Sequence, residues 1–283
     1  MKKEEIKKTV RENYAQVAKG SGTCCGTGSS CCTPKTTGCG TTTIAENISK
    51  KVGYSDEEMK SVPDGANLGL GCGNPVALAS LKEGEVVLDL GSGAGFDCFL
   101  AANKVGKKGK VIGVDMTPEM LEKARANARK GNYDNVEFRL GEIEYLPVAN
   151  NQIDIIISNC VINLSPDKGQ VFREAFRVLK PGGRLMVSDI VLLKELPEAI
   201  MASATAYVGC LSGALLKQNY LSEIKNAGFE KIDVIAEDGF DVDLMFNDPT
   251  AQNVIKDLKI STAELKNIGD SVKSMKIRAI KPG

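Results

Sequence analysis

The sequence contains no histidine and no tryptophan among its 283 residues. Without imidazole, the chain lacks the commonest general base near neutral pH and the commonest protein ligand for metals. Its 36 basic and 36 acidic side chains give a formal net charge of zero. Such a balance provides no broad attraction to nucleic acid or to an anionic membrane. We therefore expect neither as a partner, and any chemistry must rest on other residue types.

Long apolar runs are also missing, and no stretch is long enough to span a bilayer. Residues 1–8 are mostly charged and do not contain the apolar centre of a signal peptide. These two features predict a cytoplasmic protein. Thiols stay reduced in that compartment, where clustered cysteines more often bind metals or carry redox chemistry than form structural disulfides.

Cysteine is abundant by contrast, with nine in the chain. Four are well separated in the body of the sequence, and five lie close together near the N-terminus. The separated ones are Cys72, Cys98, Cys160 and Cys210, and the clustered ones are Cys24, Cys25, Cys31, Cys32 and Cys39. This distribution makes sulfur chemistry the leading candidate for function.

Short apolar strands alternate with helices through the middle of the chain, which is typical of a doubly wound parallel sheet. The expected strands are residues 86–90, 111–115, 136–140, 153–157 and 184–188, with helices after residue 95, from Pro118 to about Lys130 and over 168–179. Residues 231–235 and 275–280 are expected to add two closing strands around a helical insertion. The predicted fold class is α/β, with a Rossmann-like, mostly parallel sheet.

Three regions are expected. Residues 1–75 form N-terminal helices and a cysteine-rich arm, 76–235 form the core, and 236–283 form a C-terminal extension that closes the sheet. Helices are predicted over 4–19 and from about 44 to 52. Between them, residues 20–43 contain no Leu, Ile, Val or Phe, so this arm cannot bury enough apolar surface to offset its ordering entropy. We expect it to be a mobile loop.

A turn of the form Gly-x-Gly-x-Gly, residues 91–95, joins the first core strand to its helix. Glycine there permits a tight turn and close approach of a ligand. Asp115 ends the next strand, where its carboxylate can accept hydrogen bonds from both ribose hydroxyls. Glu142 follows the third strand and could face an adenine edge, and Asn159 ends the fourth. All these positions fall at the carboxyl edge of the sheet, where ligands bind in open α/β folds.

Together these residues resemble a class I S-adenosylmethionine-dependent methyltransferase. The turn departs from the Gly-x-Gly-x-x-Gly form that binds dinucleotides, which disfavours a nicotinamide cofactor. The resemblance implies S-adenosylmethionine as cofactor. The expected cofactor-binding residues are Asp89, Gly91, Ser92, Gly93, Gly95, Asp115, Met116, Gly141, Glu142, Ile143 and Asn159.

Three of the separated cysteines are expected near this edge. Cys72 lies between two glycines, which leave its side chain exposed and its backbone free to reshape; Cys160 ends the fourth strand; Cys210 is expected on a helix covering the same edge. Each could instead be a small buried hydrophobe, the role that we assign to Cys98. Zinc would normally take four ligands. Trivalent arsenic is thiophilic, binds three sulfurs in a pyramid and keeps a lone pair that needs no deprotonation before it attacks a methyl group.

Four stretches resemble arsenite methyltransferases: residues 70–75, 87–97, 157–165 and 209–214. The likeness covers about residues 8 to 235, and residues 277–282 also resemble bacterial and archaeal members. It implies that Cys72, Cys160 and Cys210 hold arsenic and that a fourth, more N-terminal cysteine takes part in catalysis. Cys39 is the nearest match in spacing for that cysteine. The implied substrate is arsenite or its thiol conjugates, and the implied role is arsenic detoxification.

The five arm cysteines admit two interpretations. They could form a thiol arm that captures arsenic, closes a disulfide onto Cys72 and is reduced by thioredoxin or glutathione, which we favour, or a metal-sequestering tail without a part in turnover. Two other functions remain as alternatives. One is a class I methyltransferase for an organic small molecule, and the other is a non-catalytic metalloid-binding module.

Overall fold

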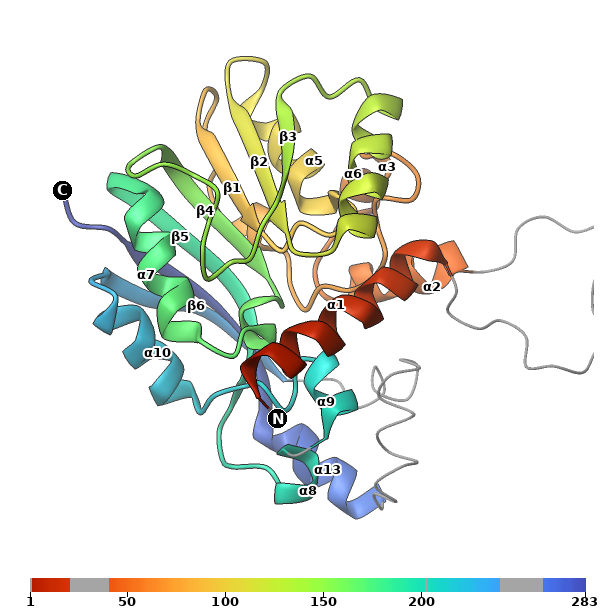
Figure 1. Cartoon of the computed structure of the whole chain (residues 1–283), viewed down its shortest axis with the longest axis vertical. Helices are drawn as coiled ribbons and strands as arrows, with labels where there is room; N and C mark the ends of the chain where they lie inside the picture. The colour runs from red at the N-terminus through yellow and green to blue at the C-terminus, as the bar shows by residue number, and fades with distance from the viewer. Residues whose placement is uncertain (1, 21–40, 202, 240–261) are drawn as a thin grey trace, which may run out of the picture.

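A seven-stranded sheet with the strand order β3-β2-β1-β4-β5-β7-β6 organises the chain (Figure 1). The computed structural model describes residues 2–20, 41–201, 203–239 and 262–283. The strands are β1 (Val86–Leu90), β2 (Lys110–Asp115), β3 (Val136–Leu140), β4 (Ile153–Asn159), β5 (Leu179–Leu192), β6 (Glu230–Gly239) and β7 (Val272–Ile280). Strands β1 to β5 are parallel to one another, as the alternating pattern predicted. The Rossmann-like fold class is confirmed.

The apolar composition of the central strands follows from burial on both faces. In β4, Ile153, Ile155, Ile156 and Ile157 have no exposed surface. A strand that alternated apolar and polar residues would place polar groups beneath a helix layer on one side, so a parallel sheet covered on both faces requires a continuous apolar run. The same pairing brings the carboxyl ends of β1, β2 and β4 to one edge.

Strand β7 inserts antiparallel between β5 and β6. Both closing strands are therefore confirmed, and β5 runs beyond the predicted residues 184–188 because β7 pairs with it from Arg184 to Leu192. Strand β6 lies at the sheet edge and is largely exposed. The division of the chain at residues 75 and 235 stays a prediction.

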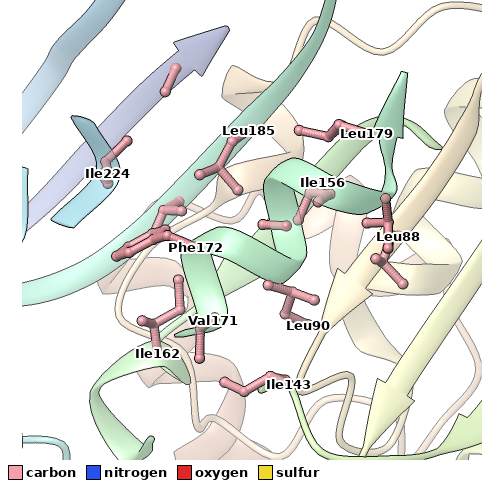
Figure 2. Close-up of a cluster of buried hydrophobic side chains, with 14 of the residues drawn as sticks. Leu88, Leu90, Ile143, Ile156, Ile162, Val171, Phe172, Leu179, Leu185 and Ile224 are labelled. Atoms are coloured by element: carbon pink, nitrogen blue, oxygen red, sulfur yellow. The ribbon is translucent and has the colours of Figure 1, made fainter. Parts of the chain in front are cut away.

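Helices cover both faces of the sheet. The larger ones are α1 (Lys3–Lys19), α2 (Thr41–Lys51), α5 (Phe96–Val105), α6 (Pro118–Lys130), α7 (Lys168–Val178), α10 (Lys217–Asn226) and α13 (Thr262–Ser271); the short ones are α3 (Asp56–Lys60), α4 (Pro75–Leu78), the 3-10 helix η1 (Ile162–Leu164), α8 (Glu198–Met201) and α9 (Ala204–Val208). Val171 and Phe172 of α7 pack with Ile224 of α10 and Ile156 of β4 in one core cluster (Figure 2). Helices α5 and α6 pack with the opposite face.

Helix α1 lies beside α6 and α9 at the carboxyl edge of the sheet (Figure 1). It confirms the helix predicted over residues 4–19, and α2 confirms the one expected from about residue 44. The five arm cysteines and the predicted mobile loop lie outside the described residues, apart from Gly20 and residues 41–43. Among the described helices, none is long and apolar enough to cross a membrane.

Candidate functional site

The glycine turn and Asp115 form one hydrogen-bonded unit. The Asp115 carboxylate accepts hydrogen bonds from the backbone N–H of Gly93 at 2.9 Å and of Thr117 at 2.8 Å. Gly91, Gly93 and Gly95 all have positive φ, a conformation that favours glycine. A Cβ atom on Gly93 would meet no protein atom within 4 Å. The turn therefore faces open space beside the Asp115 carboxylate.

Two adjoining clefts lie over this unit, with volumes of about 520 and 620 Å³. They share Tyr14, Val161 and Leu164. The first is lined by the predicted residues Gly91, Asp115, Met116, Gly141 and Ile143, and the second by Ser92, Gly93, Asn159 and Cys160. The second cleft joins the glycine turn to a cysteine, which is the arrangement that a methyl donor and a thiol-bound acceptor require.

Three of the residues expected to bind cofactor do not line either cleft. Asp89 is buried and accepts a hydrogen bond from the Cys98 thiol at 3.1 Å. Burial raises the pKa of Asp89 well above its ordinary value. A Cβ on Gly95 would clash with Phe99 and Phe138, so this glycine permits close packing behind the turn. Cys98 itself has no exposed surface and packs in the core, as predicted.

Glu142, the third of them, is engaged by α1. Lys7 donates a hydrogen bond to Glu142 at 2.7 Å and lies 3.5 Å from Glu144, and Arg11 lies 3.8 Å from Glu142. Burial lowers the pKa of Lys7, but the two carboxylates outweigh it, so the net shift is upward. Lys7 and Tyr14 of α1 line the first cleft. Sequence reasoning missed both because a lysine and a tyrosine on an amphipathic helix carry no ligand signature.

Cys72 is held from three strands. Its backbone N–H donates to the Asn159 side chain at 3.0 Å, its thiol lies 3.6 Å from the Ser188 carbonyl, and its own carbonyl accepts from Ser274 Oγ at 2.8 Å. Ser188 belongs to β5 and Ser274 to β7. The long-range β5–β7 pairing thus builds part of the Cys72 site, which no local sequence pattern could predict.

The glycines beside Cys72 serve close packing. A Cβ on Gly71 would clash with the Asn159 amide, and one on Gly73 would clash with Ser188. These glycines therefore let the chain pack directly against two strand ends, and the expected freedom of the backbone to reshape stays a prediction. Cys72 is half-buried rather than fully exposed.

Asn159 joins the Cys72 loop to a buried polar cluster. Its amide nitrogen lies 2.8 Å from the Tyr54 hydroxyl, 2.8 Å from the Gly73 carbonyl and 3.1 Å from Asp97. Tyr54 also donates to Asp97 at 2.6 Å. Burial raises the pKa of Asp97 to about 6, although both hydrogen bonds oppose the shift. These contacts engage the Asn159 amide in holding the loop, while its predicted contact with a cofactor stays a prediction.

Replacing Asn159 by alanine should loosen the Cys72 loop. The change removes the acceptor for the Cys72 N–H and leaves buried partners unsatisfied, at a cost of about 1–3 kcal/mol. We expect faster alkylation of the Cys72 thiol by a small reagent, measured by peptide mass spectrometry. Asn135→Ala is the control, because Asn135 donates to the Gly106 carbonyl remote from this loop. Equal alkylation rates in both variants would contradict the role of Asn159.

Cys160 and Cys210 share an uncommon backbone conformation. Their φ angles are 57° and 63°, in the left-handed region that non-glycine residues seldom occupy. Such strain is concentrated at functional sites. Cys160 follows β4 and donates its N–H to the Ser188 carbonyl at 2.8 Å. Cys210 lies in the turn after α9, so the expectation that it lies on a helix was wrong.

The three thiols lie together at the sheet edge. Cys210 Sγ lies 2.9 Å from the Cys160 carbonyl. Hydrogen bonds to the thiols of Cys210 and then Cys72, together with burial, raise the pKa of Cys160 well above its ordinary value. For Cys210, the hydrogen bond with Cys160 lowers the pKa, but burial and neighbouring negative charge produce a net rise. The structure therefore brings the three predicted cysteines together, with Cys160 and Cys210 favoured as neutral thiols.

Asp189 is a further member of this cluster that sequence reasoning missed. It follows Ser188 in β5 and is fully buried, and one of its carboxylate oxygens lies with the sulfur atoms of Cys72 and Cys160 within 4.8 Å of one another. Burial raises its pKa to about 7. Nearby Lys168 donates to the Ser165 carbonyl at 2.9 Å, and burial lowers its pKa to about 8. A charged residue near the carboxyl end of an apolar strand was the available signal.

A family model described as a methyltransferase domain matches residues 81–228. Among curated proteins, the arsenite methyltransferase of Halobacterium salinarum is 47% identical over 242 residues, which cover 83% of this chain and 60% of that protein. The human arsenite methyltransferase is 38% identical over 235 residues, which cover 80% of this chain and 58% of that protein. The chain thus spans about three-fifths of the length of these two relatives.

A solved structure extends the comparison. The crystal structure of an arsenic(III) S-adenosylmethionine methyltransferase from Chlamydomonas reinhardtii matches with a TM-score of 0.59 and 31% identity. The match covers 85% of this chain and 73% of that protein. Similarity at both the sequence and the fold level therefore extends well beyond the segment matched by the family model.

Proposed function

The chain belongs to the arsenite methyltransferase family of class I methyltransferases, and we propose that it methylates trivalent arsenic with S-adenosylmethionine as the methyl donor. In this proposal, Cys72, Cys160 and Cys210 hold the arsenic. The single observation that carries the proposal is the cleft that Gly93 and Cys160 line together. It places a thiol cluster beside the turn expected to bind the donor.

Arsenic capture by neutral thiols is chemically balanced. Arsenite in its neutral form carries three hydroxyl groups, and each thiol can replace one of them. Three As–S bonds form, three As–O bonds break, and three water molecules leave with the thiol protons. No base has to accept a proton in the overall exchange. This agrees with the raised pKa of Cys160 and Cys210 and with a chain that has no histidine.

The residues of the first cleft fit the donor. S-adenosylmethionine, when bound, would supply a methyl group on a positively charged sulfur. Asp115 can accept hydrogen bonds from ribose hydroxyls while its N–H contacts keep it oriented, and Gly93 leaves room for close approach. The enzyme would then contribute mainly proximity and orientation, because a correctly placed lone pair needs no further activation.

Methyl transfer raises the formal oxidation state of arsenic from three to five, so turnover needs two electrons. We propose that two thiolates supply them by forming a disulfide. In this scheme an arm cysteine, with Cys39 the first candidate, pairs with Cys72. An external thiol, from thioredoxin or glutathione, would then reduce the disulfide through a mixed disulfide. Cys72 suits this role, because it is half-buried whereas Cys160 and Cys210 are buried.

Replacing all five arm cysteines by serine should separate this thiol relay from a sequestering tail. We expect cofactor binding and arsenite capture by Cys72, Cys160 and Cys210 to persist, while repeated turnover falls. The loss should be larger with thioredoxin as the only reductant than with excess small thiol. Mass spectrometry of the unmodified protein, quenched during turnover, should find Cys72 linked to an arm cysteine. Normal turnover with thioredoxin and no such linkage would contradict the thiol relay and favour a metal-sequestering tail.

The direct test incubates the protein with arsenite, S-adenosylmethionine and thiol, and measures methylated arsenic by chromatography with mass detection. Formation of methylarsenic species at one equivalent of S-adenosylhomocysteine per methyl group supports the proposal. Two outcomes would replace it. Methylation of an organic acceptor alone would favour a different methyltransferase, and tight arsenite binding without methyl transfer would favour a metalloid-binding module.

A further inference from the structure

Asp189 has a position in the thiol cluster that arsenic binding does not require. Three sulfurs complete the pyramidal coordination of trivalent arsenic, whose lone pair occupies the remaining direction. Yet the Asp189 carboxylate, Cys72 Sγ and Cys160 Sγ all lie within 4.8 Å of one another. A buried carboxylate facing two thiols is costly unless a cation or hydrogen-bond donors compensate it. The hydrogen bonds of the Asp189 carboxylate therefore help to decide whether this cluster can also bind a cation.

The surrounding residues hold Asp189 rigidly. Its Oδ1 accepts from the Asn163 amide and from the Ile190 backbone N–H, each at 2.9 Å, and its Oδ2 accepts from the Tyr220 hydroxyl at 2.9 Å. Asn163 and Tyr220 have no exposed surface. These donors orient the carboxylate: Oδ1 accepts two hydrogen bonds and Oδ2 accepts one, so a lone pair remains on Oδ2 for a cation. Metal-binding carboxylates are similarly oriented by groups outside the coordination sphere.

Two sulfurs and one oxygen are a ligand set that soft divalent cations accept. Zinc takes thiolate sulfur at about 2.3 Å and carboxylate oxygen at about 2.0–2.2 Å, usually as a tetrahedron. Ligand atoms in such a tetrahedron lie roughly 3.5 Å apart, so binding would draw the two cysteine thiols toward the fixed carboxylate from separations within 4.8 Å. A water molecule can fill the fourth position.

We propose that Cys72, Cys160 and Asp189 form a site for a thiophilic divalent cation, Zn²⁺ or Cd²⁺, which excludes arsenite from the overlapping thiol site. Binding replaces the two thiol protons, which leave to solvent, with two metal–sulfur bonds. The ligand sets of arsenic and of the cation then differ by one residue each. Arsenic uses Cys210 and not Asp189, whereas the cation uses Asp189 and does not need Cys210. The competition with arsenite rests on the proposed function, but cation binding does not.

The test uses the full chain with the five arm cysteines replaced by serine, so that arm thiols do not bind the probe. Titration with Cd²⁺ is followed by thiolate-to-cadmium absorption in the ultraviolet, and arsenite binding is measured in parallel. Asp189→Asn should lower Cd²⁺ affinity by about tenfold or more and leave arsenite affinity nearly unchanged. Cys210→Ser should lower arsenite affinity and leave Cd²⁺ affinity nearly unchanged. Asp154→Asn is the matched control, because Asp154 lies near the start of β4, whereas Cys160 follows its end. This variant should bind both Cd²⁺ and arsenite normally.

Unchanged Cd²⁺ affinity in Asp189→Asn would overturn the proposal. Because that variant could fail to fold, cadmium-113 NMR of the parent protein provides a second measurement. A chemical shift typical of two sulfurs with oxygen supports the site, and one typical of three or four sulfurs contradicts it. If Cd²⁺ binds as expected but no methylated arsenic forms in the activity assay, the proposed function fails and the cation site stands.

Discussion

Replacing Cys160 or Cys210 by serine should abolish methyl transfer to arsenite while leaving affinity for S-adenosylmethionine near normal. Each variant removes one of the three sulfurs that fix the position of the arsenic lone pair, and a displacement of about 1 Å from the reactive geometry can cost roughly 100-fold in rate. Serine preserves the size and approximate polarity of the side chain. Single-turnover assays and arsenite titrations on the same preparations measure both effects.

Cys98→Ser is the matched control for this experiment. Cys98 is as buried as the catalytic candidates but packs in a different core cluster and hydrogen bonds to Asp89. We expect its variant to lose about 1–2 kcal/mol of stability and to methylate arsenite normally once folded. Full turnover by Cys160→Ser would contradict arsenic ligation and bring forward an organic acceptor as the substrate.

Replacing Asp115 by alanine should strongly weaken cofactor binding. The variant loses the expected contacts with ribose hydroxyls and the hydrogen bonds that Gly93 and Thr117 donate to the carboxylate. Hydrogen bonds to a charged group contribute about 1.5–3 kcal/mol each, so the loss of one ribose contact should lower affinity by roughly 10- to 150-fold, and the loss of both should lower it further. Isothermal titration calorimetry with S-adenosylmethionine measures the change.

Asp154→Ala provides the comparison, because Asp154 near the start of β4 accepts from the Val86 N–H and pairs with Lys180. Its variant should bind the cofactor normally. Gly93 offers an independent probe, since a bulky side chain there would project into the open space above the turn. Undiminished affinity in both Asp115→Ala and a bulky Gly93 variant would contradict this location of the cofactor.

The fold could be predicted from local sequence because the central strands β1, β2 and β4 are buried on both faces. Burial on both faces requires apolar runs such as Ile153–Ile157. Gly91, directly after β1, and Pro118, at the start of α6, then mark where these elements end and begin. The true length of β5 could not be predicted, since it depends on pairing with β7 from a distant part of the chain. Local composition specifies strands, whereas pairing across the sheet sets their ends.

The site was predictable to the extent that its residues follow strands. Asp115 and Cys160 were found because the carboxyl ends of parallel strands meet at one edge. The backbone of Cys210 was misassigned because a left-handed turn after a short helix leaves no mark on a non-glycine residue. Asn159 and Ser274 hold Cys72 through single hydrogen bonds between distant segments, and no spacing rule reports such contacts.

We expect three protein thiols to hold arsenic beside the methyl donor, and X-ray absorption at the arsenic edge measures this coordination. The sample is the full chain with five serines in the arm, loaded with one equivalent of arsenite and with S-adenosylhomocysteine. The expected spectrum shows three sulfur neighbours and no oxygen neighbour, with one sulfur lost in Cys210→Ser. Arsenic that retains oxygen ligands in the parent protein would contradict it.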